Sequence, residues 1–142
     1  MPLPVALAGI VGTVEIADDT FIAAAPSVVA SAVADVESWR RWWPDLELVV
    51  TRDRGVQGLV WSVRGPLSGT MEIWLEPVAD GVVLHYLVRA DPAVRRQPDR
   101  WRDRWTREWK RHAHLLKDEL ERGREPGYAS IVAVKERERP AD

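Results

Sequence analysis

The sequence contains no cysteine, and this absence excludes several kinds of chemistry. Without a thiol there can be no disulfide framework, no cysteine nucleophile and no cysteine-ligated zinc or iron–sulfur site. The composition suits a reducing compartment, so we expect a cytoplasmic protein. HExxH, G-x-S-x-G and glycine-rich phosphate-loop motifs are also missing. The sequence therefore predicts no metal site and no cofactor.

Long hydrophobic runs are lacking as well. Residues Met1–Gly12 are apolar, but they have no basic segment and are too short to cross a bilayer. We interpret residues 1–12 as an N-terminal extension, 13–123 as one domain and 124–142 as a charged tail. The net charge of −2 gives no general attraction to nucleic acid, so we expect no nucleic-acid partner.

Aromatic residues are few except for tryptophan, which occurs 8 times against 1 Phe and 2 Tyr. Wide, rigid indole rings in this number either fill a core or line a cavity. Composition alone leaves both interpretations open.

The hydrophobic pattern predicts five strands and three helices. Residues 13–24 read as a strand that is bent or interrupted at Asp18-Asp19, and two short helices follow over about 26–36 and 37–43. Short turns separate the next strands, which implies an antiparallel meander. We place those strands at residues 46–52, 58–64, 70–76 and 82–90. Alternation along the last three predicts one apolar, inward face, which includes Trp61, Ile73 and Tyr86.

The period then changes from two to about 3.6 residues. From Pro98 to Arg122 the larger side chains recur every three or four positions, which predicts one long helix with a single apolar face. That face is formed by Trp101, Trp105, Trp109, His112, Leu116 and Leu120. Together these elements predict an α+β protein in which a curved antiparallel sheet wraps around a long C-terminal helix.

Two segments resemble the START-related helix-grip (SRPBCC) superfamily, in its polyketide cyclase/dehydrase and lipid-transport branch. The first runs from Phe21 through Pro26 to the Trp39-Arg40-Arg41-Trp42-Trp43-Pro44 turn, and the second from Leu67 to Pro92. The sequence departs from the family in strand number, since members commonly have seven strands and only five are predicted here. The missing pair corresponds to the region between Arg64 and Leu67.

The resemblance implies a cavity between the concave face of the sheet and the last helix. It would hold a small apolar ligand such as a lipid, a polyketide or an aromatic metabolite, by removing apolar area from water. The predicted ligand-binding residues are Phe21, Trp61, Val63, Met71, Ile73, Leu84, Tyr86, Val88, Trp101, Trp105, Trp109 and His112.

Two other functions remain as alternatives to binding or carriage of a ligand. In a cyclase or dehydratase, His112 or Tyr86 would transfer a proton, so these two are weak catalytic candidates. In a regulatory module, the basic face of the last helix would bind a partner. Residues 95–124 hold 11 Lys or Arg against 6 Asp or Glu, which also leaves contact with a membrane surface as a less favoured interpretation.

Overall fold

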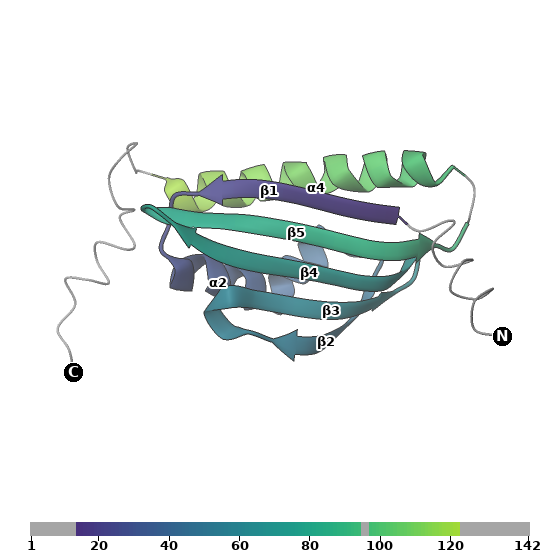
Figure 1. Ribbon diagram of the computed structural model, residues 1–142, viewed down its shortest axis with the longest axis horizontal. Coiled ribbons are helices and arrows are strands. Elements are labelled where there is room, and N and C mark those ends of the chain that lie inside the picture. Colours follow the sequence, from purple (N-terminus) through teal and green to yellow (C-terminus); the bar gives the residue numbers. More distant parts are fainter. Residues whose placement is uncertain (1–13, 95–96, 123–142) are drawn as a thin grey trace.

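The computed structural model describes residues 14–94 and 97–122 of the chain. One five-stranded antiparallel sheet, in the order β1-β5-β4-β3-β2, carries helices on one face, with α4 alongside β1 and α2 beneath the middle strands (Figure 1). The elements are β1 (Val14–Ile22), α2 (Pro26–Ala34), α3 (Val36–Trp42), β2 (Glu47–Asp53), the 3-10 turn η1 (Gly55–Gln57), β3 (Gly58–Arg64), β4 (Leu67–Val78), β5 (Gly81–Pro92) and α4 (Pro98–Glu121).

This architecture confirms the predicted α+β helix-grip fold with five strands. Strands β4 and β5 extend beyond their predicted ends, because a two-residue turn at Ala79-Asp80 keeps them paired from Val78↔Gly81 to Leu67↔Pro92. The proposed extension 1–12 and tail 124–142 lie outside the described residues.

The first strand was predicted to be bent or interrupted at Asp18-Asp19, and the interruption is wrong. All nine residues of β1 pair with β5, including Asp18 with Tyr86 and Asp19 with His85. Both aspartates are accommodated by partners distant in sequence. The Lys110 ammonium lies 3.0 Å from the Asp18 carboxylate, and the His85 ring lies 2.6 Å from that of Asp19. Ionic pairing therefore offsets the low strand propensity of aspartate.

The inner face of the sheet is apolar, as the alternation in β3, β4 and β5 predicts. Inward positions along these strands are almost fully buried, and they join α2 and α4 in one continuous core. These positions include Leu59, Trp61, Val63, Met71, Ile73, Leu75, Leu84, Tyr86, Val88 and Ala90. Burial of such side chains stabilises the fold by about 1.5–3 kcal/mol each.

The outer face carries a polar contact that links three strands. The His85 ring lies between Asp19 of β1, at 2.6 Å, and Glu76 of β4, at 2.9 Å, and stacks on Trp74. Burial lowers the pKa of His85, but hydrogen bonds and charges from Glu76 and Asp19 outweigh this effect and raise its pKa above the ordinary value.

Strand β2 forms the edge of the sheet and differs from the others. Its pairing with β3 shifts between Val50 and Arg52, so that Thr51 forms a bulge. All of its residues except Leu48 are exposed. No helix of the described residues is both long and apolar enough to cross a membrane.

Candidate ligand-binding site

An aromatic cluster lies between the sheet and the helices, built from four separate elements. Trp61 and Tyr86 occupy inward positions of β3 and β5, and Trp109 comes from the middle of α4. Trp43 follows the last residue of α3, where the backbone leaves helical geometry at φ −136° and ψ 64°. We refer to Trp43, Trp61, Tyr86 and Trp109 as the aromatic cluster.

Ring geometry ties this aromatic cluster together. Tyr86 and Trp109 are stacked, with centroids 4.2 Å apart and planes at 18°. Trp43 stacks on Trp109 at 5.8 Å and meets Trp61 edge-on at 5.2 Å. Arrangements of this kind add about 0.5–1.5 kcal/mol per pair beyond the burial of area. The aromatic cluster therefore packs α4 and the end of α3 against the sheet.

Two indole N–H groups in the aromatic cluster have no acceptor among the described residues, those of Trp61 and Trp109. The two residues are 0% and 2% exposed, so bulk water does not reach these donors. By contrast, Trp39 at the edge of the core donates its indole N–H to the Val33 carbonyl at 2.6 Å. Buried donors nearly always have a partner. These two N–H groups are therefore available to donate to an oxygen of a ligand or of a water molecule.

Tyr86 is the titratable residue of the aromatic cluster. Its hydroxyl donates to the Met71 sulfur at 3.4 Å. Burial raises the pKa of Tyr86 strongly, and a hydrogen bond with the Trp43 side chain opposes that rise only in part. Tyr86 is therefore a neutral phenol at physiological pH.

His112 lies at the margin of the core and is half-buried. Burial lowers the pKa of His112, and the neighbouring charges of Arg111 and Arg41 lower it further, against the opposite effect of Glu108. The imidazole is therefore neutral at pH 7 and lies in a positively charged environment. No three His, Cys, Asp or Glu side chains in residues 14–94 and 97–122 gather as metal ligands.

The structure brings most of the predicted site residues into one core. Eight of them are buried there: Trp61, Val63, Met71, Ile73, Leu84, Tyr86, Val88 and Trp109. Trp101 and Trp105 are half-buried and pack against this core from the N-terminal half of α4.

Phe21 was predicted to line the site, but it does not lie in the core. The inward positions at this end of β1 are Thr20 and Ile22, so Phe21 lies on the opposite face and is 38% exposed. Its ring lies beside the Lys117 ammonium, 5.5 Å from the ring centroid. Because successive side chains of a strand point to opposite faces, Phe21 must point outward when Thr20 and Ile22 point inward.

The predicted site did not include three residues that are buried beside it, Trp42, Trp43 and Ala113. Trp42, the last residue of α3, meets Trp109 of α4 edge-on at 5.5 Å. Ala113 is fully buried, one position after His112. The small size of Ala113 could have indicated its burial, because an alanine among large residues allows a helix to approach a sheet closely.

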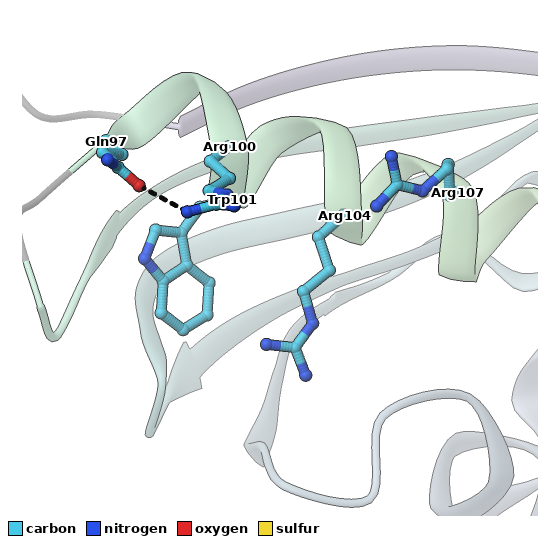
Figure 2. A pocket seen from close by; sticks show the side chains of 5 residues that line it. All are labelled: Gln97, Arg100, Trp101, Arg104 and Arg107. Atoms are coloured by element: carbon cyan, nitrogen blue, oxygen red, sulfur yellow. Dashed lines mark hydrogen bonds between the residues drawn. The ribbon is translucent and has the colours of Figure 1, made fainter.

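Two of the surface hollows formed by the described residues have tryptophans in their walls. One, of about 420 Å³, lies between α3 and β2, and Trp43 forms part of its wall together with Val36, Trp39, Arg40, Pro44, Leu46 and Leu48. The other, of about 300 Å³, lies along the first turns of α4 and is lined by Gln97, Arg100, Trp101, Arg104 and Arg107 (Figure 2). Trp43 thus connects the first hollow to the aromatic cluster, and Trp101 connects the second to the edge of the core.

Comparison with known proteins identifies the fold. No family model and no curated protein matches the sequence. Among solved structures, the chain resembles the Aha1 dimer from Colwellia psychrerythraea, with 19% identity, a TM-score of 0.59 and coverage of 79% of this chain and 99% of that one. It also resembles protein Mll3558 from Rhizobium loti, with 18% identity, a TM-score of 0.60 and coverage of 72% and 96%.

A third similar structure is the di-domain ARO/CYC protein StfQ from the steffimycin biosynthetic pathway. Its TM-score is 0.54 at 16% identity, and the match covers 80% of this chain and 54% of StfQ. The Aha1-like and ARO/CYC proteins belong to the helix-grip superfamily, so the predicted resemblance is confirmed at the level of the fold. Identities this low carry no information on substrate.

Proposed function

We propose that the protein binds a small apolar ligand with an acceptor oxygen, and that the aromatic cluster is its binding surface. The observation that carries the proposal is the pair of buried, unpartnered indole N–H groups of Trp61 and Trp109. An apolar ligand that lies against these rings gains from area removed from water, and its oxygen satisfies a donor that is otherwise costly.

Two further features support this proposal. The fold is one that ligand-binding proteins of the helix-grip superfamily use. In addition, the hollow between α3 and β2 has Trp43 in its wall, and Trp43 contacts the other members of the aromatic cluster. A ligand entering there would meet the aromatic cluster after displacement of one ring.

Binding is favoured over cyclase or dehydratase chemistry by the titratable groups. Proton transfer on a reactive chain needs at least one group with a pKa near the working pH, held in the site. Tyr86 is a neutral phenol whose pKa is raised by burial, and His112 is at the margin of the core beside Arg41 and Arg111. The described interior therefore provides donors and apolar surface rather than an acid–base pair.

Partner binding is the second candidate, and one observation favours it. Tyr86 and Trp109 stack at 4.2 Å, which leaves no room for a ligand between these two rings. If the rings never separate, the aromatic cluster is core packing and the helices present a fixed surface to a partner.

Matched probes distinguish these two functions. We expect 2-acetylnaphthalene, which has a carbonyl acceptor, to bind about fivefold more tightly than 2-ethylnaphthalene, which has none, because one hydrogen bond contributes roughly 1 kcal/mol. Ligand-observed NMR titration measures both affinities. Native mass spectrometry of the purified protein, before and after organic extraction, tests for a ligand retained from the expression host.

Two single variants assign the effect to the indole donors. Trp61→Phe and Trp109→Phe keep an aromatic ring but remove the N–H group, so at least one should abolish the preference for the ketone. Trp74→Phe is the matched control, because Trp74 lies on the outer face of the sheet and is 38% exposed. If neither probe binds and no ligand is retained, the ligand-binding proposal is wrong and partner binding is the favoured function.

A further inference from the structure

The described residues that line the hollow along the first turns of α4 include three arginines and no carboxylate. Figure 2 shows the side chains of Trp101 and Arg104 extending from the helix toward the same side. Arg100 donates to the Gln97 side chain at 3.0 Å, and the Arg104 guanidinium lies 5.8 Å from the centroid of Trp101. The Arg104 contact places one guanidinium group within cation–π distance of the Trp101 ring.

The positive charge of this hollow is largely uncompensated. Asp99 and Asp103, the acidic residues of these turns, both pair with Arg102 at 3.3 Å. Arg104 pairs with Glu108 at 3.3 Å, whereas Arg100 and Arg107 have no ion pair among the described residues. An anion entering the hollow therefore meets two guanidinium groups, those of Arg100 and Arg107, whose charge is not matched by a described carboxylate.

Cationic groups of α4 and α3 also lie near His112, farther along the helix. The pKa of His112 is lowered by Arg111 and Arg41, in addition to burial, which indicates that cations of α4 and α3 act on the same point. Trp101 meanwhile packs against the buried core, so the hollow and the core share this ring. Trp109 of the aromatic cluster follows eight residues later, about 12 Å along the helix axis at 1.5 Å per residue.

We propose that the hollow formed by Gln97, Arg100, Trp101, Arg104 and Arg107 holds the carboxylate of an amphipathic ligand whose apolar body lies against the core. The proposal rests on the proposed function and narrows the ligand class to apolar acids. Guanidinium groups bind carboxylates through paired, charge-assisted hydrogen bonds, and Trp101 provides the adjoining apolar surface.

A charged and a neutral probe of the same shape test this proposal. We expect 2-naphthoate to bind the intact protein on the order of tenfold more tightly than 2-naphthamide at low ionic strength. The preference should decrease as salt is added, because the arginines are exposed. Titrations followed by ligand-observed NMR give both affinities.

The variant Arg100→Gln/Arg107→Gln removes two guanidinium groups without breaking an ion pair, and it should reduce the preference to less than about threefold. Arg52→Gln/Arg64→Gln is the matched control, since it changes the net charge equally at exposed positions outside the hollow, and it should keep the preference.

The remaining outcomes contradict the proposal in separable ways. Equal binding of 2-naphthoate and 2-naphthamide overturns the anion site and leaves the proposed function standing, whereas failure of all naphthalene probes overturns both. If both double variants lost the preference for 2-naphthoate, the preference would come from the net charge of the protein and not from the hollow. Sedimentation with phosphatidylserine vesicles but not phosphatidylcholine vesicles, without a preference for 2-naphthoate, would assign the arginines to a lipid surface instead.

Discussion

The two halves of α4 contact the rest of the protein in different ways. In the C-terminal half, Lys110 lies 3.0 Å from Asp18 and from the Thr20 hydroxyl, and 2.9 Å from the Asp19 carbonyl. Lys117 donates to the Phe21 carbonyl at 2.7 Å, and Glu121 accepts from the Ala23 amide at 2.6 Å. Three side chains thus attach this half to β1 and the residue after it.

The N-terminal half has a different character. Side-chain hydrogen bonds and ion pairs described for Pro98–Glu108 stay within that segment and Gln97. Trp101 and Trp105 are half-buried, whereas Trp109 is 2% exposed. The C-terminal half is thus attached to β1 by polar contacts, while the N-terminal half leaves apolar and cationic side chains partly exposed, as the proposed ligand site requires.

The largest expected effect is the loss of the Trp109 ring. Trp109→Ala should lower the free energy of unfolding by about 3–5 kcal/mol, because it leaves a cavity in contact with Trp43 and Tyr86. Trp105→Ala, in the other half of the helix, should cost less than half as much. Urea denaturation measures both free energies of unfolding. Equal losses in the two variants would contradict the difference between the two halves of α4.

A smaller effect is expected at the polar attachment to β1. Lys110→Met keeps much of the side chain's length but removes the ammonium, which leaves Asp18 without its ion pair. We expect a loss of about 1 kcal/mol, reduced by partial exposure of Lys110. Arg104→Met is the control in the N-terminal half and should change stability by less than about 0.5 kcal/mol. A larger loss at Arg104 than at Lys110 would reverse the assignment.

The smallest expected effect concerns His85, which ties β5 to β1 and β4 in the stable region. Because the folded state raises the pKa of His85, its contribution is complete below the unfolded pKa of about 6.5 and is lost as pH rises through the folded value. We expect less than about 1 kcal/mol, since Asp19 and Glu76 are well exposed. The wild type should therefore lose slightly more stability than His85→Gln between pH 6 and pH 9.

Thermal and urea unfolding across this pH range test the His85 prediction. His114→Gln, which removes an exposed imidazole of α4, serves as the control for the loss of a histidine. An identical pH dependence in the wild type and His85→Gln would show that the contacts with Asp19 and Glu76 contribute nothing measurable.

Local patterns were sufficient to predict the elements, and contacts distant in sequence explain the errors. The alternation through Trp61, Ile73 and Tyr86 identified the buried face because its period depends only on neighbouring residues. The break predicted at Asp18-Asp19 was wrong because the partners of these residues, Lys110 and His85, lie 92 and 66 positions away.

The candidate site was predictable to a similar extent. Helical spacing found Trp109, but it gave Trp101 and Trp105 the same status, since a period cannot indicate where along a helix the sheet makes contact. Trp43 was not predicted as a member of the aromatic cluster because its backbone is no longer helical, so no helical face applies to it. The unpartnered N–H groups become evident only from tertiary packing.

The bulge at Thr51 has a consequence for the behaviour of the protein in concentrated solution. Strand β2 is a sheet edge with exposed Val49 and Val50, and such an edge is a template for strand addition and aggregation. The register shift after Val50 interrupts the row of regularly spaced backbone groups, and the charged Arg52 and Asp53 follow it directly. The edge farthest from α4 thus resists fibril-like stacking by its own shape.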